Sequence, residues 1–307
     1  MLKMELREFI RLRRMINLRN LDRFNYPKPV LTSILTQKIV DKVKARHPTY
    51  VERLNEIAEH WREKKRFPSW FVAPPMIKVK LLMKALGFTK SEIRRFIEDP
   101  NLIEDDDLRR LVWRANLKDF VYSPIATKFH QIKGKMGEEI IKNWLENFGI
   151  DFSSEDELRR NEGKTPDFLL EKPIKLDGYE VYWIESKAMF GDPNVHSQYW
   201  RRQYYEYLRR FGRGVVIYWF GHVNGLFLAT TGYEFGGDRL LNMKAYLSDD
   251  GVELGDAFSR KFTEHMMRLL DLFYKGGKIV IKPNRWAVSI LSRLGFEILT
   301  DDEPSDF

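Results

Sequence analysis

The chain has 307 residues, of which 43% are hydrophobic and 31% are charged, a balance that excludes collagen-like and disordered proteins. The absence of cysteine excludes disulfides, thiolate nucleophiles, zinc ribbons and iron–sulfur clusters. No apolar run approaches the ~20 residues that span a bilayer. The first residues form an amphipathic pattern and not a secretory signal, so we expect a cytoplasmic protein that makes no membrane contact.

The formal net charge of +8 is unevenly distributed along the chain. Residues 1–90 contain 21 Lys and Arg against 8 Asp and Glu, whereas residues 91–307 contain 31 against 36. A basic surface attracts the phosphate backbone, so nucleic acid is the expected partner. The alternative is a solvated helical surface, because Lys and Arg are good helix formers.

Residues 1–121 have mostly helical apolar spacing and predict a basic, all-helical module. Within it, a helix that Gly87 closes is followed by Thr89 and Glu92, a capping-box pattern for a second helix. This arrangement predicts a helix-turn-helix at about 76–98, with an ordinary helical hairpin as the alternative. The cations of its second helix are expected to contact phosphate and not base edges: Lys90, Arg94 and Arg95.

Further along, three aspartates at 105–107 begin another expected helix, through about Lys118. From Tyr122 the pattern changes, and residues 122–245 alternate between helices and strands. We expect a helix over about 133–149, strands at 167–170 and 179–188, a helix over about 197–211, and strands at 215–221 and 225–231. Residues 246–307 predict an α/β extension packed on this domain, with helices at 256–274 and 285–294 and strands at 278–282 and 296–299.

Two acidic residues, Asp167 and Glu185, lie on neighbouring strands of this predicted domain. Pro166 lacks an N–H and belongs at the edge or the first residue of a strand, which places Asp167 near the end of the sheet. Glu185 and Lys187 end the next strand and share one face of it. Two converging carboxylates suit a hard cation such as Mg²⁺ or Mn²⁺, with the Ser186 carbonyl as a further ligand. A lysine beside the ion can orient water or offset transition-state charge.

The Glu-x-Lys spacing alone is weak evidence, because the chain also contains Glu63 with Lys65 and Glu162 with Lys164. For each isolated pair the alternative is a surface ion pair of little energetic value. Only Glu185 and Lys187 end an apolar strand that follows a Pro-Asp strand.

Helices on either side of the strands offer further candidates. Glu138 begins the preceding helix and is a candidate third carboxylate, with Glu139 as its rival and stabilisation of the helix dipole as the alternative role. Gln203 and Tyr207 share one helix face and are candidates to position the lysine, water or phosphate, or else form a polar pair against the sheet. The cations among neighbouring aromatic rings are candidate nucleic-acid contacts: Arg201 and Arg202.

Pro-Asp followed by Glu-x-Lys, after a helix bearing Glu, resembles the PD-(D/E)XK nuclease superfamily, and Gln203-x-x-x-Tyr207 resembles its RecB-like branch. The segments KTPDFLL, WIESKAMFGD and RRFGRGVVIYWFG are similar to those of the TPD-motif family. The resemblance implies an α+β or α/β protein with an N-terminal helix-turn-helix region and a restriction-endonuclease-like mixed sheet. It implies a metal-dependent site at Asp167, Glu185 and Lys187, assisted by Glu138, Gln203 and Tyr207.

The leading hypothesis is a Mg²⁺- or Mn²⁺-dependent phosphodiesterase that hydrolyses DNA. The alternatives are a nucleic-acid-binding or scaffold protein on a degenerate nuclease fold, and a nuclease acting on RNA. Endo- or exonuclease action, structure preference, a homodimeric state, and a nucleoid or nuclear location according to the source are left open.

Overall fold

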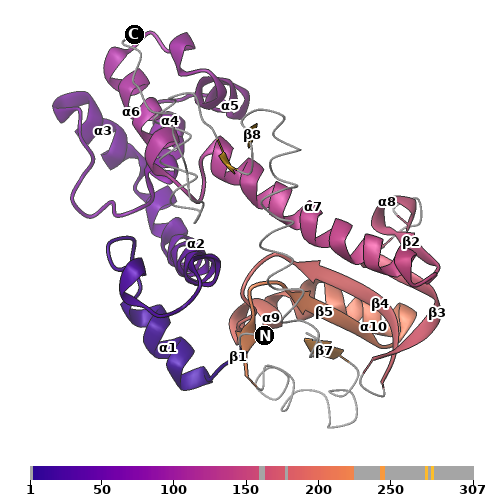
Figure 1. Ribbon diagram of the computed structural model, residues 1–307. Helices are drawn as coiled ribbons and strands as arrows, with labels where there is room; N and C mark the ends of the chain where they lie inside the picture. The colour runs from indigo at the N-terminus through magenta and orange to yellow at the C-terminus, as the bar shows by residue number, and fades with distance from the viewer. Residues whose placement is uncertain are drawn as a thin grey trace. The chain divides into compact units, whose positions relative to one another are not determined.

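The computed structural model describes residues 3–158, 163–176 and 179–224, and the backbone of the short strands at 243–245, 274–275 and 278–279. The chain forms two compact units. The sheet unit comprises Met1–Ile16 and Ile132–Leu269, and the helical unit comprises Asn17–Gln131 and Leu270–Phe307. The mixture of helices and a mixed sheet confirms the expected α+β class (Figure 1).

The helical unit is built around one apolar core. Its core includes Trp61, Phe71, Met76, Leu82 and Val112, all at most 4% exposed. Within this core, Met76, Val79 and Met83 recur at helical spacing, so their helix buries one apolar side. Its elements are η1 (Leu21–Arg23), α2 (Lys28–Glu52), α3 (Leu54–Lys64), α4 (Pro75–Ala85), α5 (Lys90–Glu98), η2 (Pro100–Leu102) and α6 (Asp106–Lys118).

The predicted helix pair is confirmed as α4 and α5. Gly87 between them has φ +95°, a conformation that favours glycine. The Thr89 hydroxyl accepts the Glu92 N–H, and the Glu92 carboxylate accepts the Thr89 N–H at 2.8 Å, which completes the capping box. Binding of DNA by α5 stays a prediction.

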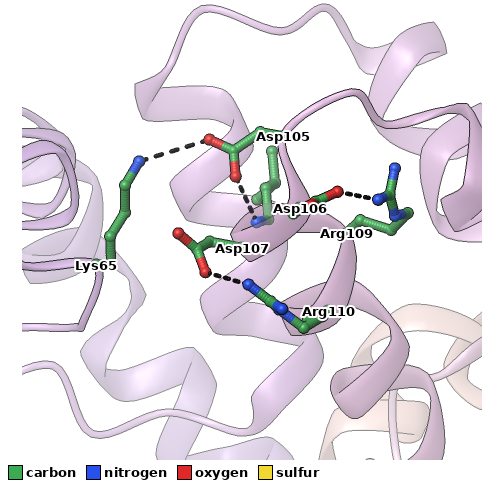
Figure 2. Close-up of polar contacts among 7 residues, drawn as sticks. Lys65, Asp105, Asp106, Asp107, Arg109 and Arg110 are labelled. Atoms are coloured by element: carbon green, nitrogen blue, oxygen red, sulfur yellow. Dashed lines mark hydrogen bonds and ion pairs between the residues drawn. The ribbon is translucent and has the colours of Figure 1, made fainter.

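Helix α6 begins as its three aspartates predict. Asp105 is the N-cap and accepts the Leu108 N–H at 2.8 Å. Figure 2 shows its other carboxylate oxygen facing Lys65, whose Nζ lies 3.5 Å away. In the same view Asp106 pairs with Arg109, and Asp107 pairs with Arg110. Carboxylates near the positive end of the helix dipole stabilise this first turn.

The sheet unit contains a mixed five-stranded sheet in the order β2-β3-β4-β5-β7 (Figure 1). The pairs β2–β3 and β3–β4 are antiparallel, and the pairs β4–β5 and β5–β7 are parallel. The apolar strand β5 lies between two others and is almost entirely buried, as its sequence predicts. The strands are β2 (Phe152–Ser154), β3 (Phe168–Leu176), β4 (Tyr179–Lys187), β5 (Gly214–Tyr218) and β7 (Met243–Ala245).

The helices of the sheet unit lie before and between these strands. Helix α7 (Pro124–Asn147) precedes β2 and begins earlier than predicted, because Pro124 starts it and Ser123 Oγ accepts the Ala126 N–H at 3.2 Å. Short α8 (Glu155–Leu158) follows β2. Between β4 and β5 the chain forms α9 (Pro193–Tyr199), a π-helical turn (Trp200–Tyr204) and α10 (Tyr205–Phe211).

The first residues of the chain also belong to the sheet unit, whereas the sequence placed residues 1–121 in one helical module. Strand β1 (Lys3–Met4) pairs in parallel with β6 (His222–Val223). Helix α1 (Leu6–Met15) follows, and its Phe9 ring stacks on Phe190 at 5.7 Å. Strand pairing between segments so far apart in the chain leaves no local signal in the sequence.

Several expectations concern residues outside the described part of the chain. They are the strand at 225–231, the helices at 256–274 and 285–294, and the strand at 296–299; of the expected strand 278–282 the structure describes β9 (Lys278–Ile279), paired with β8 (Tyr274–Lys275). Among the described helices, none is both long and apolar enough to cross a membrane.

Helix α7 approaches the sheet at a glycine. A Cβ added at Gly137 would lie 2.6 Å from Ser186 Oγ and closer still to the Trp219 indole nitrogen. These two groups are hydrogen bonded to each other at 2.9 Å. Gly134, one turn earlier on the same helix, would have no neighbour within 4 Å of an added Cβ.

We therefore expect Gly137→Ala to lower the free energy of unfolding by about 1–3 kcal/mol, because the added methyl group overlaps a packed hydrogen bond. The control Gly134→Ala should be neutral or stabilising by up to ~1 kcal/mol, the helix-propensity difference. Urea unfolding followed by circular dichroism measures both. Equal stabilities of the two variants would contradict the close approach.

Candidate active site

The pairing register brings the two predicted carboxylates together. Phe168 of β3 lies opposite Ile184 of β4, so Asp167 arrives opposite Glu185. The Asp167 N–H donates to Glu185 Oε2 at 3.3 Å, and the Ser186 N–H donates to Asp167 Oδ2 at 2.7 Å. Glu185 is only 2% exposed. The structure thus confirms that these acids converge from adjacent strands.

Lys187 completes the group. Its ammonium forms an ion pair with Glu185 Oε1, as expected for positions i and i+2 on one strand face. Its Nζ also lies 4.9 Å from the centre of the Tyr199 ring. This cation–π contact fixes the direction of the side chain. The contribution of Tyr199 was not predicted from the sequence.

The site holds two carboxylates and one ammonium group that are largely shielded from water. Burial raises the pKa of Asp167, and burial together with the Asp167 charge raises that of Glu185, although Lys187 opposes both shifts. Burial alone would lower the pKa of Lys187, but the two carboxylates outweigh it and raise that pKa. Two carboxylates held this way favour a cation beside them.

Helix α7 contributes a third carboxylate. Burial, then the charges of Asp167 and Glu155, raise the pKa of Glu138. Asp167 is among the charges that act on Glu138, and the choice between Glu138 and Glu139 as the residue facing the site stays a prediction. The role of Glu138 as a metal ligand stays a prediction.

The sequence interpretation missed a fourth acid, Glu155. It begins α8 directly after β2, and its N–H donates to the Asp167 carbonyl at 3.1 Å. Its charge also raises the pKa values of Asp167, Glu138 and Tyr207. The available signal was the run of acids just before the Pro-Asp strand, but only the β2–β3 pairing shows that it reaches the site.

Gln203 and Tyr207 lie on the helix that connects β4 to β5. Tyr207 is 1% exposed, packs edge-on against Trp183 at 5.3 Å, and has its pKa raised by burial and by Glu185 and Asp167. It therefore faces the carboxylates. Gln203 lies in the π-helical turn, and its side-chain oxygen is buried without a hydrogen-bond partner in the described part of the chain.

Ser186 has a structural role between the two site residues on β4. Its N–H binds Asp167, and its hydroxyl accepts the Trp219 indole N–H. Trp219 in turn donates its backbone N–H to the Lys187 carbonyl at 3.1 Å. The Ser186 carbonyl as a metal ligand stays a prediction.

The donor set fits a magnesium-like cation, which uses one or two carboxylates and fills its other positions with water and phosphate. Asp167 and Glu185 supply two hard oxygen donors in a buried position where their charges repel. In the described residues no three His, Cys, Asp or Glu side chains are arranged as a metal-binding group. The fit is thus to an ion held by two carboxylates and not to an all-protein cage.

The predicted nucleic-acid contacts lie apart from this group in the chain. Lys90, Arg94 and Arg95 are exposed on α5 in the helical unit, where Arg94 also pairs with Glu98 at 2.9 Å. Arg201 and Arg202 are exposed in the π-helical turn of the sheet unit. Their binding of phosphate stays a prediction.

A buried histidine lies on α9, next to Tyr218 of β5. His196, on α9, is 1% exposed, and its Nδ1 lies 2.9 Å from the Tyr218 hydroxyl. Burial, assisted by the charge of His222, lowers the pKa of His196 to about 4. The ring is therefore neutral in the folded protein at neutral pH.

Comparison with known proteins agrees with the resemblance seen in the sequence. A family described as a protein of unknown function with the TPD sequence motif matches residues 104–234. CDAN1-interacting nuclease 1 of Homo sapiens is 37% identical over 139 residues, 45% of this chain and 50% of the relative. The protein of the same name in Danio rerio is 36% identical over 139 residues, 45% of this chain and 46% of its own length.

A more distant relative, an uncharacterized protein of Acanthamoeba polyphaga mimivirus, is 26% identical over 151 residues, 47% of this chain and 54% of the relative. The chain spans about half the length of the curated relatives it matches. No solved structure matches it with significance. The matched segments contain the whole of the carboxylate and lysine group described above.

The buried neutral His196 predicts a loss of stability in acid. Its pKa is lowered on folding, so the unfolded chain binds a proton near pH 6.5 that the folded protein rejects until about pH 4. The stability is present above pH 6.5 and declines as the pH falls to 4. Between pH 7 and pH 5 we expect the titration of His196 to lower the free energy of unfolding by about 2 kcal/mol.

His196→Gln provides the comparison, since an amide keeps a hydrogen-bonding group but does not titrate. Urea unfolding at both pH values should show a smaller acid loss for this variant than for the wild type. An identical loss would mean that other groups cause the acid sensitivity.

Proposed function

From the match of residues 104–234 to the TPD-motif family, we propose that this chain is a divalent-metal-dependent nuclease that hydrolyses phosphodiester bonds in DNA. One observation carries the proposal: Asp167, on one strand, meets Glu185 and Lys187 of the next strand at one buried point. The name of the vertebrate relatives, a nuclease, supports the same reaction class.

In this proposal Asp167 and Glu185 hold the ion, Mg²⁺ or Mn²⁺, and Glu138 assists through its charge. When bound, such an ion supplies Lewis acidity, which lowers the pKa of water and offsets phosphate charge. Lys187 keeps its proton because both acids raise its pKa, so it remains a cation beside the reacting phosphate. That charge stabilises the additional negative charge of the transition state.

Neighbouring residues hold this group in place. Tyr199 and Glu185 direct the Lys187 ammonium from two sides. The Ser186 N–H fixes one oxygen of Asp167 and leaves the other for the ion. Gln203, whose buried oxygen has no partner among the described residues, and Tyr207 are positioned to bind water or phosphate at the edge of the site.

The substrate is proposed from the charge of the chain. The excess of Lys and Arg over Asp and Glu in residues 1–90 supplies a basic surface for a nucleic-acid backbone. The α4–α5 pair favours duplex DNA over RNA, because a helix pair of this kind fits the major groove. The name of the vertebrate relatives also states an interaction with CDAN1, and that interaction is a property of those relatives.

A second candidate is a nucleic-acid-binding protein on an inactive nuclease fold. It is favoured by the lack of a three-residue metal-binding group among the described residues. Cleavage assays distinguish the two candidates.

We expect Asp167→Asn and Lys187→Met each to lower the cleavage rate by on the order of 100-fold or more, since each removes a charge needed at the reacting phosphate. Labelled single-stranded, duplex, flap and four-way-junction DNA, and RNA, are incubated with Mg²⁺ or Mn²⁺ and resolved on denaturing gels. Binding measured by fluorescence anisotropy in chelator should stay within about threefold of the wild type.

The matched control is Glu63→Gln, from a second Glu-x-Lys pair in the helical unit. This variant should cut at the wild-type rate. Wild-type cleavage by Asp167→Asn or Lys187→Met would refute the assigned role of that residue. Absence of metal-dependent cleavage by the wild type on every substrate would favour the binding protein.

A further inference from the structure

A second lysine lies beside the site without an acidic partner. Lys133 is on α7, and its Nζ lies 5.6 Å from the centre of the Phe220 ring. It is one helical turn before Gly137, so both residues share the side of α7 that approaches Trp219 and Ser186. Phe220 follows Trp219 directly, and the strand before them pairs Tyr218 with Lys187. Lys133 therefore faces the chain segment that borders the active site.

The charge of Lys133 is uncompensated. The side chain is partly buried, and in the described part of the chain it forms no ion pair. Burial lowers the pKa of Lys133 to about 8, and no carboxylate contributes to that shift. Lys187 is the opposite case, since Glu185 and Asp167 raise its pKa. The carboxylates of the site therefore contribute nothing to the pKa shift of Lys133.

Burying a cation against an aromatic ring costs free energy unless an anion approaches the cation. The ring holds the ammonium in place, and among the residues that the structure describes no acceptor meets its hydrogen-bond donors. A nucleic-acid strand passing through the site brings one negative charge per nucleotide. A backbone phosphate of such a strand would supply the anion that compensates the charge of Lys133.

We propose that Lys133 is a substrate-binding residue that binds the backbone phosphate adjacent to the scissile one. The proposal rests on the proposed nuclease function and adds a binding contact separate from the reacting group. It assigns to Lys133 no part in the chemical step.

The test compares Lys133→Met with Lys133→Arg, which keeps the charge, and with Lys135→Met, an exposed lysine two residues along the same helix. Binding of a labelled oligonucleotide is measured by anisotropy with Ca²⁺ in place of Mg²⁺, over a series of salt concentrations. We expect Lys133→Met to bind on the order of tenfold more weakly, with a salt slope smaller by about 1. The other two variants should remain close to the wild type.

Steady-state cleavage gives an independent readout: KM should rise for Lys133→Met while kcat changes little. Wild-type affinity and salt slope in Lys133→Met would overturn the inference. A wild-type protein that binds but cuts nothing would refute the nuclease proposal and leave the binding comparison valid.

The unmodified protein provides a test that does not depend on the folding of a variant. At pH 8 the amine of Lys133 is substantially unprotonated, so amine acylation mapped by mass spectrometry should modify it early. Bound oligonucleotide should protect Lys133, with Lys135 as the reference lysine. Equal modification of Lys133 with and without oligonucleotide would contradict the proposed contact.

Discussion

The structure of the site depends on keeping two carboxylates together where water is largely excluded. Asp167 and Glu185 repel each other there, and burial adds to the cost of their charges. Lys187 and the Ser186 N–H offset part of that cost. The remainder is supported by the strands themselves, because β3 and β4 cannot shift register without exposing their apolar face. The paired strands thus keep the two carboxylates close together in spite of their mutual repulsion.

Much of this arrangement follows from local patterns. Pro166 predicts where a strand begins, and the alternation along β4 predicts that Glu185 and Lys187 share a face. The structure confirms both, together with the capping box at Thr89 and the helix that begins at Asp105. These features are predictable because each depends on residues a few positions apart in the chain.

Other features depend on long-range contacts and escaped prediction. Glu155 joins the acidic group only because β2 pairs with β3, and Tyr199 meets Lys187 only because α9 returns over the sheet. The π-helical turn at Trp200–Tyr204 has no local sequence signal that we recognise. It alters the relation between Gln203 and Tyr207 that regular helical spacing predicts, and such turns occur often at functional sites.

The pairing of β1 with β6 affects how the polypeptide matures. Asn224 Nδ2 donates to Glu5 Oε1 across 219 positions, and Arg13 reaches Asp192 at 3.4 Å. The helical segment leaves the sheet unit after Ile16 and returns to it near Ile132, so it is an insertion within a discontinuous domain. During synthesis the inserted helices emerge, with their mostly local contacts, long before β1 meets its partner. The first strand therefore stays unpaired during synthesis until its partner strand, residues 222–223, has been made.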